Sequence, residues 1–232
     1  MCLRKIIFYI LMVITTAMPF RSFTAPEPPP DINRIIYKME AVREKIDDLV
    51  AAVELIPRAG DGGPGVPALI TLSYQKPDKL KTVVNGGREV LINGARMWIY
   101  SPDLGIVEAY RLKDEEQRQA TLYEMSWGLT SPIKVLLRGT NRSAAVQADG
   151  SYLVTVVPDQ KDAEIREVRA RVDPRTWLIS RMVISRQSQP PVELEIKEWR
   201  INSGLSDRFF DFRLPEGADL FEPLESGGDV IQ

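Results

Sequence analysis

Hydrophobic and polar residues alternate along most of the chain, which is the pattern of half-buried β-strands. In the segment 68–76, for example, Ile70, Leu72 and Tyr74 share one face and polar residues dominate the other. Short turn signals separate such segments, and Asn93-Gly94 is a strong signal for a two-residue hairpin. The predicted strands, ten or eleven in all, lie at 68–76, 80–84, 90–92, 95–100, 106–112, 144–146, 152–157, 168–172, 178–184, 192–196 and 210–214.

This series of strands predicts a mainly β fold. Strands joined by short turns, with few helical connections between them, favour an antiparallel meander. A sheet of so many strands must curl strongly or close on itself. The sequence therefore predicts one domain, built on a strongly curved antiparallel sheet.

A helical period precedes the strands. Asp31 is a suitable N-cap, and apolar residues that include Ile35 and Met39 follow at helical spacing as far as Ile46. The spacing predicts an amphipathic helix over 31–46 that packs its apolar stripe against another element.

The segment 113–140 interrupts the strand pattern. Thr130 or Ser131 can cap a short helix with Pro132 at its first position, running over 133–137. The segment is too apolar for a free loop, so we expect it to cover one face of the sheet. We hypothesise that 120–138 is a movable lid.

The first residues predict an export signal over 1–25. Arg4 and Lys5 precede an unbroken apolar run over 6–14, and small residues follow it. An uncleaved membrane anchor is the alternative, but the run is shorter than the roughly 20 residues that span a bilayer. A proline-rich linker at 26–30 and a single domain over 31–232 complete the predicted organisation.

The composition narrows the possible chemistry. The 232 residues contain no histidine and one cysteine, Cys2, which excludes imidazole catalysis, intramolecular disulfides and cysteine-built metal sites. The formal net charge of −2 argues against a broad basic surface for nucleic acid. Glu193 and Glu195 share a strand face near Lys197, as expected of the outward side of an amphipathic strand. We therefore expect no enzyme activity, no metal and no cofactor.

One strand is apolar on both faces. Trp98 and Tyr100 point to one side of it and Ile99 to the other. A strand of this kind in an antiparallel sheet needs cover on both faces. Two interpretations remain open, a core strand beneath a helix and a wall of a cavity for an apolar ligand.

The stretch 97–104 reads Met-Trp-Ile-Tyr-Ser-Pro-Asp-Leu. With four other stretches, it resembles the LolA family of outer-membrane lipoprotein carriers, and it is the most specific of the five. The other stretches are 76–80, 93–94, 130–137 and 210–219, so the resemblance covers nearly the whole predicted domain.

The resemblance implies an incomplete, strongly curved antiparallel β-barrel with a helical lid over a hydrophobic cavity. It also implies a soluble, monomeric periplasmic protein that binds the acyl chains of lipoproteins or lipids. Such a carrier receives its cargo from an inner-membrane exporter and delivers it to an outer-membrane acceptor. The alternative is a periplasmic regulatory module that senses lipids or lipoproteins on the same scaffold.

The candidate ligand-binding residues come from the strands and from the predicted lid. The sheet candidates are Ile70, Leu72, Tyr74, Leu80, Trp98 and Tyr100. The lid candidates are Trp127, Leu129, Ile133 and Leu136.

Overall fold

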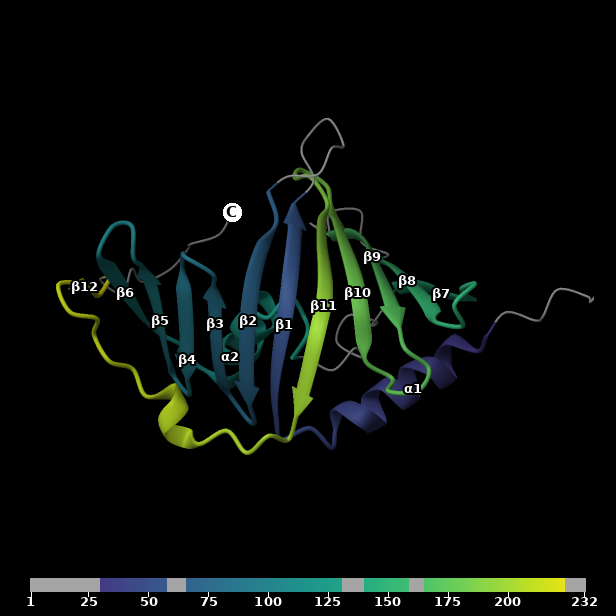
Figure 1. Ribbon diagram of the computed structural model, residues 1–232, viewed down its shortest axis with the longest axis horizontal. Coiled ribbons are helices and arrows are strands. Elements are labelled where there is room, and N and C mark those ends of the chain that lie inside the picture. The colour runs from purple at the N-terminus through teal and green to yellow at the C-terminus, as the bar shows by residue number, and fades with distance from the viewer. Residues whose placement is uncertain (1–29, 58–65, 131–139, 159–164, 224–232) are drawn as a thin grey trace, which may run out of the picture.

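The computed structural model describes residues 30–57, 66–130, 140–158 and 165–223. These residues form a 12-stranded sheet in the order β12-β6-β5-β4-β3-β2-β1-β11-β10-β9-β8-β7 (Figure 1). The strands are β1 (Asp48–Pro57), β2 (Ala68–Gln75), β3 (Lys79–Val84), β4 (Glu89–Asn93), β5 (Arg96–Ser101), β6 (Ile106–Arg111), β7 (Thr140–Val146), β8 (Tyr152–Pro158), β9 (Ile165–Val172), β10 (Ile179–Arg186), β11 (Val192–Ile201) and β12 (Asp219–Phe221). The helices are α1 (Ile32–Arg43), α2 (Glu115–Met125) and the short 3₁₀ helix η1 (Asp207–Phe210).

Two antiparallel meanders make up the sheet and meet where β1 pairs with β11. β1 to β6 follow one another in sequence and in space, as do β7 to β11. The short β12 pairs in parallel with β6. Within the described residues β12 and β7 are the two edges and do not pair with each other. The prediction of an incomplete, curved antiparallel β-barrel is confirmed, with twelve strands instead of ten or eleven.

The turn chemistry explains much of this agreement. Asn93 pairs with Arg96 across the two-residue connection between β4 and β5. Gly94 has a φ of 59° there, a conformation that glycine adopts without steric cost. The predicted helix at 31–46 is also present as α1, although it ends at Arg43. Asp31 caps it, accepting a hydrogen bond of 3.0 Å from the Asn33 backbone N–H.

The prediction missed β1, the strand at the centre of the sheet. Its first half is buried on both faces, since Leu49, Val50 and Ala51 are successive core residues. A continuous apolar run lacks the alternation of period two, and it directly follows a helical pattern. The sequence around 48–57 therefore carries no clear strand signal.

The predicted strand at 210–214 is wrong. Phe210 ends η1, and the chain then continues without a ladder partner, through a turn at 216–217, until β12 begins at Asp219. Phe212 packs instead on the ring of Trp98, with centroids 4.8 Å apart and planes 3° from parallel. The alternating phenylalanines cover a sheet face and do not extend the sheet.

The prediction also missed α2, because its residues are mostly polar and only Leu122 is fully buried. A local signal was nevertheless present. Asp114 caps the helix by accepting from the Gln117 N–H at 2.8 Å, while the Gln117 side chain accepts from the Lys113 N–H at 2.6 Å. This arrangement resembles a capping box.

Three predicted segments lie outside the described residues: the helix at 133–137, the signal at 1–25, and residues 26–29 of the linker.

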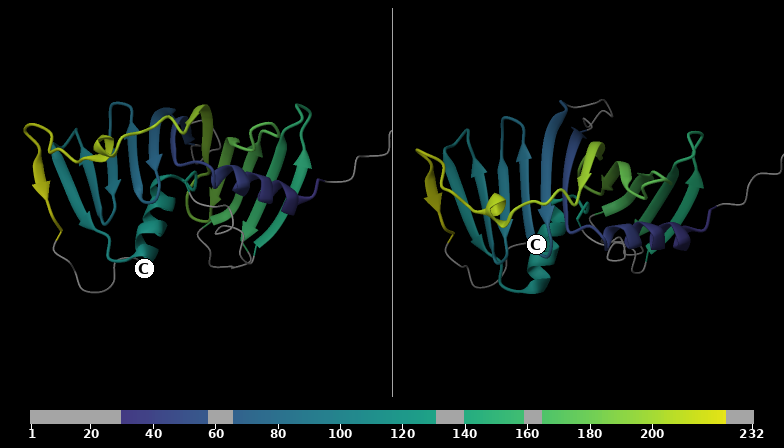
Figure 2. Two further views of the ribbon diagram at one scale, coloured as in Figure 1. Left: turned by 90° about the horizontal axis from the view of Figure 1, so that it is seen from below. Right: turned by 60° about the horizontal axis from the view of Figure 1, so that its bottom comes forward.

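The two α-helices, α1 and α2, lie on one face of the sheet (Figure 2). The C-terminal segment, residues 202–223, crosses the opposite face. One continuous core cluster joins Ile35, Ile36 and Met39 of α1, Leu122 of α2, and inward-facing strand residues from both meanders. The strand side of this cluster includes Leu49, Val53, Ile70, Leu72, Leu80, Ile92, Met97, Ile99, Val172, Met182, Ile184 and Leu194. None of the helices that the structure describes combines the length and the apolar character of a membrane span.

The face away from the helices carries an ion-pair cluster. Lys197 lies 2.7 Å from Glu54 and 3.1 Å from Glu195. Glu193 lies on the expected outward face, since its neighbour Leu194 belongs to the core cluster, but it is buried there, with 3% exposure, and pairs with Arg181. An ion pair explains how a carboxylate can be buried at this place in β11.

Asp48 fastens the start of β1 to the chain that follows β11. Its buried carboxylate accepts hydrogen bonds from Ser203 N at 2.8 Å, Ser203 Oγ at 2.9 Å and Gly204 N at 3.0 Å. Burial raises the pKa of Asp48, but these hydrogen bonds together lower it by more, so the net pKa lies below the ordinary value.

We expect Asp48→Ala to lower the free energy of unfolding by about 2 kcal/mol at pH 7, because it leaves buried donors unpaired. A carboxylate with a lowered pKa stabilises the fold above its unfolded pKa of about 4. The difference from wild type should therefore shrink as the pH falls through the folded pKa. Urea denaturation at several pH values measures it.

Asp47→Ala is the matched control. The Asp47 side chain is 84% exposed, and its ion pair with Lys76 is 3.5 Å long. Its loss should cost less than about 0.5 kcal/mol. Equal losses for the two variants would show that the Asp48 carboxylate does not hold the 203–204 backbone.

Candidate functional site

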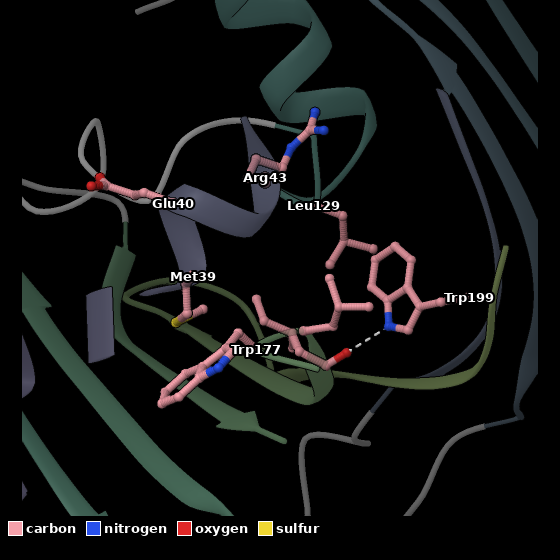
Figure 3. A pocket seen from close by; sticks show the side chains of 9 residues that line it. Met39, Glu40, Arg43, Leu129, Trp177 and Trp199 are labelled. Carbon is pink, nitrogen blue, oxygen red and sulfur yellow. Dashed lines mark hydrogen bonds between the residues drawn. The ribbon is translucent and has the colours of Figure 1, made fainter. Parts of the chain in front are cut away.

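A small apolar cavity lies between three parts of the fold (Figure 3). They are α1, the covering segment (residues 126–130, directly after α2) and the second meander, β7 to β11. The volume of the cavity is about 50 Å³. The residues that line this apolar cavity are Met39, Glu40, Arg43, Gly128, Leu129, Trp177, Leu178, Ile179 and Trp199. Helix, covering segment and sheet therefore meet at one point of the concave face.

Two tryptophans form the sheet side of the apolar cavity. Trp177 lies in the turn between β9 and β10, with a φ of 59° that is unusual for a bulky residue. Its ring stacks on Tyr152 at a centroid distance of 5.8 Å. Trp199 of β11 donates its indole N–H to the Ile179 carbonyl at 2.9 Å. These contacts fix both indoles while leaving apolar ring surface toward the cavity.

The end of α2 directs Leu129 into the apolar cavity. Gly128 has a φ of 74° and donates its N–H to the Tyr123 carbonyl at 2.8 Å. A Cβ added there would lie 2.7 Å from the Tyr123 ring, so no other residue fits without movement. The Ser126 and Thr130 hydroxyls, both buried, lie 2.6 Å apart and close the turn. Leu129 is thereby held facing Trp199 (Figure 3).

Arg43 links three elements above the apolar cavity. Its Nε donates to the Thr130 carbonyl at 3.1 Å, and its Nη2 donates to the same oxygen. The guanidinium carbon lies 4.8 Å from the ring centroid of Tyr74 in β2. Burial lowers the pKa of Arg43, while Tyr74 partly restores it; burial likewise raises the pKa of Tyr74, against the effect of Arg43. The α1 helix, the covering segment and the first meander are held together by this one side chain.

A larger and more polar cavity adjoins the apolar one. Its volume is about 390 Å³. The residues that line this polar cavity are Glu40, Arg43, Glu44, Tyr74, Lys76, Gln119 and Thr130. Glu40 and Arg43 border both cavities, so the two spaces are neighbours.

The structure divides the sheet candidates between two faces. Ile70, Leu72, Tyr74 and Leu80 belong to the core cluster on the helix side. Trp98 and Tyr100 point to the opposite face, because Met97 and Ile99, their neighbours in β5, belong to that cluster. Trp98 is covered there by Phe212, so these two aromatics do not join the other candidates.

Of the lid candidates, Leu129 lines the apolar cavity and Trp127 packs against the core cluster. Ile133 and Leu136 lie outside the described residues.

The prediction missed Arg43, Trp177 and Trp199. Trp177 sits in a turn, where no strand pattern marks it, whereas Trp199 is a half-buried residue near the end of β11. Within the described residues no group of three or more acidic, histidine or cysteine side chains could hold a metal ion.

No family model and no curated protein match the chain. Solved structures do match, and one is an uncharacterized conserved protein from Thermus thermophilus, with a TM-score of 0.53 and 9% identity over 83% of this chain and 100% of that one. A LolA superfamily protein from Nitrosomonas europaea has a TM-score of 0.42 and 11% identity, covering 78% of this chain and 97% of that one. The lipoprotein LppX from Mycobacterium tuberculosis has a TM-score of 0.42 and 12% identity, covering 76% and 99%. The open, curved antiparallel sheet with two α-helices on one face is the architecture that the resemblance in the sequence implied.

Proposed function

We propose that this protein is a periplasmic carrier that binds the acyl chains of lipoproteins or lipids on its concave face. It receives them from an inner-membrane exporter and delivers them to an outer-membrane acceptor. Residues 1–25 direct export, and residues 31–232 act as one carrier domain behind the linker at 26–30. The observation that carries the proposal is the apolar cavity between Met39, Leu129, Trp177 and Trp199, beneath a covering segment.

The size of the apolar cavity bears on the mechanism. Pockets for small molecules usually enclose about 300–1,000 Å³, whereas this one encloses about 50 Å³. An acyl chain therefore enters only when Leu129 and its segment, or α1, move away from the sheet. The proposal therefore assigns the carrier a closed conformation before loading, in which the protein's own side chains occupy the ligand's place.

The energies permit such an exchange. Burying one methylene contributes about 0.8 kcal/mol, so a chain of about 14 methylenes contributes roughly 11 kcal/mol before ordering costs. Part of this free energy opens the closed state, and the remainder sets the affinity. The cost of opening reduces the net binding free energy, and a carrier needs this reduction because it must also release its cargo.

The tryptophans provide a direct test. A stearate with bromine atoms at mid-chain quenches indole fluorescence on contact. We expect saturable quenching in the wild type, strong loss of that quenching in a variant with Trp177→Phe and Trp199→Phe, and little change in Trp98→Phe. Trp98 is the matched control because it lies on the opposite face, stacked on Phe212.

Thermal denaturation and near-ultraviolet circular dichroism confirm that each variant is folded. Absence of saturable quenching in the wild type would contradict the carrier proposal. Quenching that depends on Trp98 alone would instead place the ligand on the face crossed by the C-terminal segment.

A further inference from the structure

Arg43 is a half-buried cation without an acidic partner in the described part of the chain. Two of its nitrogens, Nε and Nη2, donate to one neutral acceptor, the Thr130 carbonyl. Its third nitrogen, Nη1, is fully buried and has no hydrogen-bond partner among the described residues. Glu40, the nearest acid along α1, points away from the guanidinium (Figure 3).

This arrangement leaves a positive charge only partly compensated. A charge withdrawn from water normally requires a counter-charge and hydrogen bonds to all its donors. The C-terminal end of α1, the Thr130 carbonyl and the Tyr74 ring supply only partial negative charge. An anion on the side of the guanidinium that borders the polar cavity would supply the missing counter-charge.

The polar cavity provides the space for such an anion. Its volume of about 390 Å³ falls within the range of small-molecule sites. Lys76 supplies a second cation, and its side chain is 37% exposed. The Lys76 Nζ lies 2.6 Å from the Glu44 carbonyl and 3.5 Å from Asp47, which holds the ammonium at the edge of the cavity. Two acids also line the polar cavity: Glu44 is exposed to solvent, and Glu40 points away from the guanidinium (Figure 3).

We infer that the polar cavity is a site for the anionic head group of an amphiphile, a carboxylate or a phosphate, held by Arg43 and Lys76. The inference rests on the proposed function, since the tail of the same ligand occupies the adjoining apolar cavity. Because Arg43 borders both cavities, it marks the junction between head and tail. The preferred cargo is thus an acidic lipid rather than an uncharged one.

The test compares two ligands that differ only in charge. Mid-chain brominated stearate and the corresponding brominated stearyl alcohol are titrated at pH 8 by tryptophan quenching. We expect the wild type to bind the acid about tenfold or more tightly than the alcohol. In Arg43→Gln this preference should fall to less than about threefold, and Arg43→Lys should recover part of it.

The ratio of the two affinities is the decisive quantity. Arg43→Gln also weakens the contact with Thr130 and can change the affinity for both ligands, but that effect cancels in the ratio. Lys38→Gln is the matched control, because Lys38 is exposed on the same helix and lines neither cavity. It should leave the preference unchanged, whereas Lys76→Gln should reduce it.

Inorganic phosphate distinguishes a free anion from a lipid head group. Competition by millimolar phosphate against the acid, but not against the alcohol, assigns the site to anions in general. Lack of competition, with the acid preference intact, assigns it to the heads of amphiphiles. Equal affinities for acid and alcohol in the wild type, or a preference that persists in Arg43→Gln, would overturn the head-group site and leave the carrier proposal standing. Failure of both ligands to bind would overturn the carrier proposal itself.

Discussion

Replacing Phe210 with alanine is expected to lower the free energy of unfolding by about 3–5 kcal/mol. The Phe210 side chain is 0% exposed, although it belongs to a short 3₁₀ helix in an otherwise irregular segment. The side chain of Asn93 in β4 donates to its carbonyl at 3.2 Å, so this segment is fastened to the sheet beside the buried ring. Removing the ring leaves a cavity that the flanking strands cannot fill. Guanidinium denaturation measures the loss.

Phe209→Ala is the matched comparison at the preceding position. Phe209 is 44% exposed and touches Phe210 edge-on, with ring centroids 5.1 Å apart. We expect a loss of about 1 kcal/mol or less for this variant. Similar losses for the two substitutions would mean that the C-terminal segment does not contribute a buried anchor to the fold.

The same segment explains why one part of the site could not be predicted from the sequence. Trp98 and Tyr100 give β5 a second apolar face, and two kinds of cover are compatible with it. The actual cover of Trp98 is Phe212, which is more than a hundred residues away in sequence. No local pattern identifies such a distant partner, so the face that carries the candidate site could not be chosen from periodicity.

The strands themselves could be predicted more easily, because their signals are local. Alternation and turn residues specify β2 to β6, although the two-residue connection between β4 and β5 is Gly94-Ala95, one residue later than the Asn93-Gly94 signal. β1 is the exception for a physical reason: the central strand is buried on both faces at its start, and burial on both faces removes the alternation.

The candidate site depends on features that a linear pattern does not contain. The apolar character of Leu129 is visible in the sequence, yet its position depends on the left-handed φ of Gly128. Trp177 faces the apolar cavity from a strained turn, and strain of this kind is visible only in the folded backbone. In the sequence alone, Arg43 is an ordinary polar residue at a helix end.

Leu129→Ala is expected to raise the affinity for a long acyl chain by about tenfold or more. Leu129 is 6% exposed and lies beside Trp199, in the space that the proposed function assigns to the ligand. Truncating a buried leucine costs about 2–5 kcal/mol, and here that cost falls on the closed state. The bound state does not contain the lost contact, so opening becomes easier while the ligand's own contacts remain. Titration with the brominated stearate measures the change.

The control variant must lower the free energy of unfolding without changing how Leu129 and the ligand compete for the same space. Val107→Ala meets this need, because Val107 is 0% exposed in β6 and lines neither cavity. It lies on the face of Trp98 and Tyr100, since it pairs directly with Tyr100. Its loss should destabilise the empty and loaded states equally and leave the affinity unchanged. If Leu129→Ala bound more weakly than the wild type, Leu129 would be part of the ligand's binding surface and not a substitute for the ligand.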